Sequence, residues 1–180
     1  MRQKAWVLGL AMLIALGGCL GMPDGVEPVR DFEPSRYLGR WYEIARLDHG
    51  FERGLESVNA NYSLRDDGGI KVVNRGFNTD DGEWQEAVGK AYFVEDDSVA
   101  HLKVSFFGPF YGSYVVFDLD KREYSTAFVS GFNKSYLWLL ARSPTVSESV
   151  KADFVSQAES LGFATDELIW VDQSRSADAP

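Results

Sequence analysis

Gly39-Arg40-Trp41-Tyr42 opens the first of eight short stretches, rich in β-branched and aromatic residues, that extend to Ala141. Turn-forming clusters such as Asp66-Asp67-Gly68-Gly69 separate these stretches, which is typical of strands joined by hairpins. Residues 58–64 alternate between apolar even positions and polar odd positions, so one face of that strand should be buried. The predicted strands are 39–47, 56–65, 69–78, 83–94, 99–107, 113–119, 124–130 and 135–141.

Eight sequential antiparallel strands predict an all-β, up-and-down barrel, because closure removes the exposed edges of an open sheet. An amphipathic helix follows, which Thr145 or Ser147 can cap and Gly162 can end. Its apolar stripe comprises Val146, Val150, Phe154, Val155, Ala158 and Leu161. An extended piece at 166–172 comes last. We expect the helix to pack outside the barrel and the short final strand to add to its edge.

The N-terminal residues have the pattern of an export signal: Arg2 and Lys4 precede an apolar run that ends in Leu16-Gly17-Gly18-Cys19. The run is shorter than the roughly 20 residues of a membrane span. This tetrapeptide resembles a bacterial lipobox, which implies cleavage before Cys19 and acylation of its thiol. A signal peptide that is cut elsewhere and merely contains a cysteine is the alternative.

The domain organisation follows from these signals. We expect a lipoprotein signal peptide at 1–18, a lipidated tether at 19–36, one domain at 37–173 and a tail at 174–180. The tether is rich in proline and glycine and has little apolar content, so order should begin near Tyr37.

The charge of the chain is acidic. Without Arg2 and Lys4 the formal net charge falls from −9 to −11, and no basic cluster stands out. Nucleic acid and anionic lipid surfaces are therefore poor electrostatic partners.

Signals for catalysis are weak. His49 and His101 are the two histidines, and neither has a partner at metal-ligand spacing. Neither a G-x-S-x-G element nor a phosphate-binding glycine loop occurs. We therefore predict no catalytic residue, metal or cofactor. Glu43, which shares the inward parity of Trp41, is the single candidate for a buried carboxylate, and it could hold a pocket water or a polar head group.

Three motifs together resemble those of the lipocalin family: Gly39-Arg40-Trp41-Tyr42, Asp118-Leu119-Asp120 with Tyr124, and Trp138-Leu139-Leu140-Ala141-Arg142. Two further segments, 51–55 and 106–112, look like the bacterial outer-membrane subgroup, whose relatives include apolipoprotein D and plant temperature-induced lipocalins.

The resemblance implies transport or storage of a fatty acid or lysophospholipid, a role in envelope maintenance, and dimerisation as an option. It also implies an anchor in the inner leaflet of the outer membrane, facing the periplasm. Leu20 fits this location, because an aspartate after the lipidated cysteine commonly retains lipoproteins in the inner membrane.

Antiparallel order brings the start of the first barrel strand close to the end of the eighth. The guanidinium of Arg142 should then lie over the indole of Trp41 in a cation–π contact worth about 0.5–2 kcal/mol. We interpret Gly39, Trp41 and Arg142 as residues that close the barrel.

An eight-stranded barrel can either fill with side chains or hold one small ligand. Small inward residues leave room that aromatic ones can line, which suits an elongated apolar ligand. Strand parity predicts the inward set to be Ala60, Tyr62, Val72, Asn74, Ala91, Leu102, Val104, Phe106, Tyr114, Val116, Tyr136 and Trp138.

Two rival functions stay open. The aromatic residues could fill the barrel of a structural envelope lipoprotein, or the fold could support an enzyme that acts on a lipid or isoprenoid through Glu43 or a tyrosine. The loop at 107–112 is too apolar for an ordinary solvated turn, which predicts a pocket rim, a membrane contact or a dimer surface. A loop folded onto its own barrel is the alternative.

Overall fold

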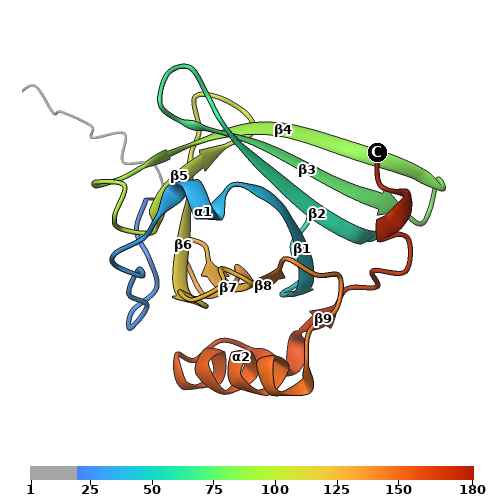
Figure 1. Cartoon of the computed structure of the whole chain (residues 1–180). Helices are drawn as coiled ribbons and strands as arrows, with labels where there is room; N and C mark the ends of the chain where they lie inside the picture. The colour runs from blue at the N-terminus through green and yellow to red at the C-terminus, as the bar shows by residue number, and fades with distance from the viewer. Residues whose placement is uncertain (1–19) are drawn as a thin grey trace, which may run out of the picture.

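Eight strands close into an antiparallel barrel in the computed structural model, which describes residues 20–180 (Figure 1). Strands that follow one another in the chain pair with each other, and β8 also pairs with β1. The predicted all-β, up-and-down barrel is therefore confirmed. The strands are β1 (Gly39–Arg46), β2 (Leu55–Leu64), β3 (Ile70–Asn78), β4 (Glu83–Phe93), β5 (His101–Ser105), β6 (Gly112–Leu119), β7 (Thr126–Ser130) and β8 (Leu137–Ala141).

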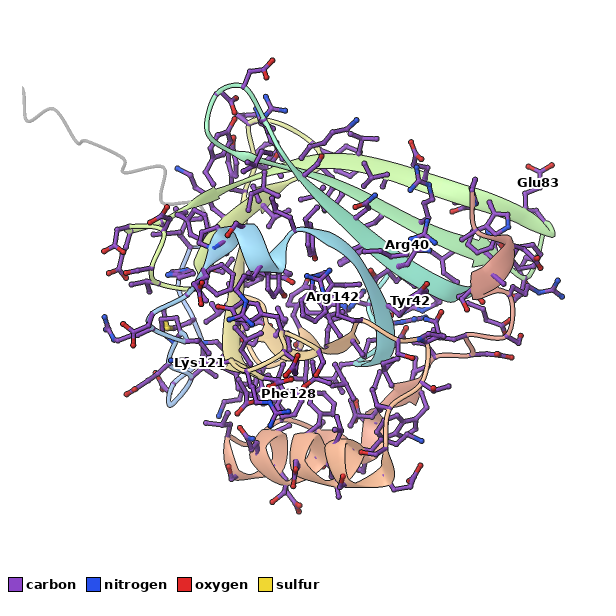
Figure 2. All side chains as sticks on the ribbon, in the orientation of Figure 1. Arg40, Tyr42, Glu83, Lys121, Phe128 and Arg142 are labelled. Carbon is purple, nitrogen blue, oxygen red and sulfur yellow. The ribbon has the colours of Figure 1, made fainter. Side chains whose placement is uncertain are left out.

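Helix α2 (Glu148–Ser160) packs on the outside of the barrel, below β7 and β8 in Figure 1. Ser147 caps it, since the Ser147 hydroxyl accepts a hydrogen bond from the amide of Val150. Gly162, with a φ of +79°, follows the last turn, where the left-handed conformation favours glycine. The fully buried Phe154 ring packs edge-on against Phe128 of β7, at 5.0 Å between ring centroids. Figure 2 labels Phe128 on the side of the barrel that faces the helix.

The final strand β9 (Ile169–Trp170) pairs with β1, as predicted, although it is shorter than the predicted 166–172. The residues that follow β9 connect β1 and β2 through hydrogen bonds. These two strands pair directly only over Gly39–Tyr42. Beyond that point the side-chain amide of Gln173 donates to the carbonyls of Glu43 and Val58, at 2.7 and 2.9 Å. The C-terminal segment therefore closes a gap between two barrel strands.

The segment before β1 is more ordered than the sequence predicts, and the expectation that order begins near Tyr37 is wrong. Val26 and Phe32 are each only 4% exposed. The amide of Val29 donates to the carbonyl of Val116, and the carbonyl of Val29 accepts from the amide of Ala100. A few apolar residues suffice here, because they pack on the barrel while Val29 satisfies backbone groups of Ala100, just before β5, and of Val116, within β6. The predicted signal peptide (1–18) and lipidation site (Cys19) lie outside the described residues.

One end of the barrel is covered by the short helix α1 (Pro34–Tyr37) and held by Arg142. The guanidinium carbon of Arg142 lies 4.0 Å from the centroid of the buried Trp41 ring. Its nitrogens donate to three backbone carbonyls, those of Arg36, Arg40 and Tyr124. Figure 2 shows Arg142 inside the ring of strands, next to β1.

Gly39 lies beside the same guanidinium. Its φ of +92° belongs to the left-handed region, and a Cβ there would lie 3.4 Å from Nη1 of Arg142. A side chain at this position would therefore strain the backbone and crowd the arginine. Gly39, Trp41 and Arg142 thus occupy the place at which the sequence puts the closure of the barrel.

Candidate ligand-binding cavity

A cavity of about 290 Å³ lies inside the barrel, on the side away from Arg142. Eleven of the twelve residues predicted to face inward line it. The exception is Val116, which is fully buried and belongs to the same inner core as Phe32 and Trp41. Strand parity places Val116 on the inner face correctly, but the residue lies toward the closed end, where side chains fill the barrel.

The cavity is also lined by residues that the strand pattern does not predict. Tyr37 comes from α1, Phe51 and Glu52 come from the loop between β1 and β2, and Phe132 comes from the loop between β7 and β8. Alternation cannot place such residues, because a loop has no two-residue period. Asn59 has the polar parity of an outward residue, yet it lines the cavity next to a register shift in β2. A bulge of this kind changes which side chains face inward.

Three tyrosine hydroxyls meet at the inner end of the cavity. The Tyr114 hydroxyl lies 2.8 Å from that of Tyr37 and 3.1 Å from that of Tyr62. Burial raises the pKa of Tyr62 to about 12 and the pKa values of the other two well above 10, so all three stay neutral. The three hydroxyl groups carry three protons but form only two hydrogen bonds with one another. One hydroxyl proton of the cluster is therefore not used within it.

Two buried carboxyl groups face the same cavity. Glu43 is 4% and Glu52 6% exposed, and both line the wall. A 2.7 Å ion pair joins Glu43 to Arg46, and the indole nitrogen of Trp138 donates to Glu52 at 3.2 Å. Burial raises the pKa of each carboxyl, and the charge of Glu52 raises that of Glu43 further. The pair therefore keeps a proton to a higher pH than exposed carboxyl groups would.

His49 lies behind this wall and is neutral. Its Nε2 is 3.2 Å from a carboxylate oxygen of Glu52 without the alignment of a hydrogen bond. The ring stacks on Phe51 at 4.2 Å between centroids and is 7% exposed. Burial, with a contribution from the positive charge of Arg46, lowers the pKa of His49 to about 4. At neutral pH the cation behind this wall is therefore Arg46, which is already paired with Glu43.

Comparison with known proteins decides the family. The lipocalin-like domain model matches residues 32–173, which is most of the chain. This chain belongs to the lipocalin family. The fold agrees, since it superposes on insecticyanin from the tobacco hornworm Manduca sexta with a TM-score of 0.69 at 21% identity, covering 87% of this lipocalin and 89% of that chain.

Bacterial lipocalins are much more similar in sequence. Outer membrane lipoprotein Blc from Vibrio cholerae is 59% identical over 160 residues, which are 89% of this chain and 94% of the relative. The protein of the same name from Escherichia coli is 56% identical, over 84% of this chain and 85% of its own. Apolipoprotein D from Rattus norvegicus is 36% identical, over 75% and 79% respectively. The predicted resemblance to the outer-membrane lipocalins and to apolipoprotein D is confirmed.

The open end of this lipocalin carries an apolar rim. Phe107 and Phe110, between β5 and β6, are 81% and 77% exposed, and Phe51 is 61% exposed. The alternative of a loop folded onto its own barrel is therefore wrong for Phe107 and Phe110. Phe51 also lines the cavity, so the rim continues into the cavity wall. Over residues 20–180, the structure contains no helix that is both long and apolar enough to cross a membrane.

Proposed function

We propose that this lipocalin binds one small hydrophobic molecule, such as a fatty acid or a lysophospholipid, and stores or transports it. The observation that carries the proposal is the cavity of about 290 Å³, whose wall is mainly apolar and contains a few polar groups. This volume is near the lower limit of about 300 Å³ for ligand pockets. A narrow single chain suits it better than a bulky ring system. The same cavity argues against a barrel filled with side chains.

The proposal includes a membrane anchor at Cys19, on the periplasmic side of the outer membrane, and a role in envelope maintenance. Its support is the Leu16-Gly17-Gly18-Cys19 motif and the names of the bacterial relatives, which are outer membrane lipoproteins. The acidic charge of the chain leaves nucleic acid outside the proposed partners. The proposal includes a homodimer because a second copy of the chain would cover the exposed apolar rim.

Native mass spectrometry tests the ligand directly. The Cys19→Ser protein, purified from its host without detergent, should carry one additional mass that organic extraction releases as a lipid. Ala60 lines the cavity, so the Ala60→Phe variant should fold and carry no such mass. Recovery of empty protein from both variants, with no binding of added lipid, would contradict the proposal.

The same experiment separates binding from catalysis. The buried Glu43 is the group that would favour an enzyme, since a carboxyl with a raised pKa can act as a general acid. The family and the names of the relatives point to a binding protein instead. A lipid recovered unchanged after long incubation supports binding, whereas a chemically altered lipid would support an enzyme.

A further inference from the structure

Two buried amide oxygens on one wall of the cavity have no hydrogen-bond partner among residues 20–180. Asn59 is fully buried and lines the cavity, and its Oδ1 has no hydrogen-bond partner anywhere in the described chain. The buried Oδ1 of Asn74, also on the cavity wall, lacks a partner among residues 20–180 as well. A buried polar atom without a partner destabilises the protein, so a ligand that donates a hydrogen bond to it would recover that loss.

These atoms lie close to the two carboxyl groups. Asn59 pairs with Tyr42 across β1 and β2, one residue before Glu43. Asn74 pairs with Ala60, the neighbour of Asn59. The carbonyls of Glu43 and Val58 bind the same nitrogen of Gln173, which fixes the distance between the two strands at this point. The carboxyl groups and the free amide oxygens therefore form one patch, here called the acceptor wall (Glu43, Glu52, Asn59 and Asn74).

Two donors beside the carboxyl groups, Nη1 of Arg46 and the indole N–H of Trp138, are already used by the protein. Nη1 of Arg46 donates a hydrogen bond to Glu43, and Nη2 donates to the carbonyls of Glu52 and Leu55. Its Nε is buried without a partner in residues 20–180, but Arg46 is not part of the cavity lining. The indole N–H of Trp138 donates a hydrogen bond to Glu52. A ligand carboxylate placed here would lie beside the carboxyl groups of Glu43 and Glu52, where Arg46, the nearby cation, is already paired with Glu43.

We propose that the acceptor wall binds the polar head of the ligand and selects an amphiphile whose head donates hydrogen bonds, an alcohol or a primary ammonium, over one whose head only accepts. The inference rests on the proposed function, because it assigns the polar end of a molecule held in the cavity. Under this arrangement the head lies against β1, β2 and β3, and the chain extends along the apolar residues of the opposite strands. A free fatty acid would keep its carboxylate away from this wall.

The test uses ligands that share one saturated chain and differ only in the head: a primary alcohol, a primary amine, a methyl ester and a carboxylate. Their dissociation constants are measured by displacement of a fluorescent lipid from the Cys19→Ser protein. The alcohol and the amine should bind about tenfold more tightly than the ester, the effect of one or two hydrogen bonds to a buried or charged acceptor. This comparison needs no further variant and is unaffected by any folding defect.

Two variants then locate the selectivity. Glu52→Gln keeps an acceptor for Trp138 but loses the charge, and Asn59→Ala removes the free amide oxygen. Each should reduce the ratio of alcohol affinity to ester affinity severalfold, whatever its effect on the affinity for the ester itself. The matched control is Glu83→Gln, at the exposed outer tip of the β3–β4 hairpin in Figure 2, which should behave as the parent protein does.

The outcomes distinguish this inference from the proposed function. If none of the four ligands binds, the proposed function fails. If the ester binds as tightly as the alcohol, ligand binding stands and the acceptor wall is overturned. If the preference for the alcohol survives in both Glu52→Gln and Asn59→Ala, the head lies elsewhere, with the tyrosine cluster as its place, and the inference is again wrong.

Discussion

Arg142 connects three parts of the chain at the closed end of the barrel. Its guanidinium covers the Trp41 ring and donates to carbonyls from α1, β1 and the turn between β6 and β7. Those carbonyls would have to find other donors if the side chain were removed. The residue does not line the cavity, so its contribution should be to stability rather than to affinity.

Arg142→Ala should therefore lower the free energy of unfolding by about 1–3 kcal/mol, from the cation–π contact and the lost hydrogen bonds. Lipid affinity of the folded variant should stay nearly unchanged. Thermal denaturation and lipid titration measure the two quantities. Arg122→Ala, whose side chain is 89% exposed, is the control and should change neither. An affinity loss without a loss of melting temperature would place Arg142 in the binding site.

Trp138 is the residue that reports on the cavity. Its ring lines the wall, and its indole nitrogen donates to Glu52. Binding of a fatty acid or lysophospholipid should shift the tryptophan emission, and Trp138→Phe should remove most of that shift. Trp170, which is 45% exposed outside the barrel, is the matched position, so Trp170→Phe should leave the shift intact. A full shift in Trp138→Phe would mean that the lipid binds away from this wall.

At the scale of elements, α2 packs on the barrel through one side only. Phe154 and Ala158 are its buried residues, and they contact a cluster on the outer face of the barrel that does not line the cavity. The helix and the ligand therefore occupy opposite faces of the same sheet. This separation predicts that damage to the helix interface changes stability without changing binding.

Phe154→Ala should cost about 3–5 kcal/mol, as expected for a large aromatic side chain removed from a closed core. Urea denaturation measures the loss, and the dissociation constant of a bound lipid, determined well below the midpoint, should be unchanged. Ser156→Ala, on the exposed side of α2, serves as the comparison. Equal stability of the two variants would show that α2 adds little to the barrel.

The strands and the helix could be predicted because each has a local signal, either alternation between turn clusters or an apolar stripe with a cap. What the sequence does not show depends on contacts between distant residues. The bulge that turns Asn59 inward, the loop that brings Glu52 to Trp138, and the order of the segment around Phe32 all arise when the barrel closes. Within the cavity, parity therefore predicts the apolar wall and several polar groups, among them Glu43 and Asn74, and misses Glu52 and Asn59.

At the scale of the whole molecule, the proposed anchor at Cys19 lies outside the residues that form the barrel. Leu20, the first described residue, lies beside His101 of β5. Cys19→Ser should abolish partition into membranes and leave the melting temperature unchanged. Fractionation of the native host, with the wild-type protein as reference, measures the partition. A soluble wild-type protein would contradict the lipidation of Cys19.

The buried titratable groups make the stability of the molecule depend on pH in two opposite directions. Glu43 and Glu52 have raised pKa values, so the folded protein holds their protons above the ordinary value of 4.5, and these groups favour folding as the pH falls through that window. His49 acts in the opposite direction. Its folded pKa of about 4 lies below the ordinary 6.5, so the unfolded chain binds this proton first as the solution is acidified.

His49→Phe isolates the second effect, since phenylalanine keeps an aromatic ring against Phe51 and cannot be protonated. The stability that the neutral histidine provides is present above its unfolded pKa of 6.5 and is lost as the pH falls toward about 4. Between about pH 7 and about pH 5 the wild-type protein should lose about 2 kcal/mol more than the variant. Urea denaturation at both pH values measures this difference independently of any constant cost of the substitution. Equal losses would mean that the folded protein protonates His49 readily, as an ion pair with the carboxylate 3.2 Å away on Glu52 would allow.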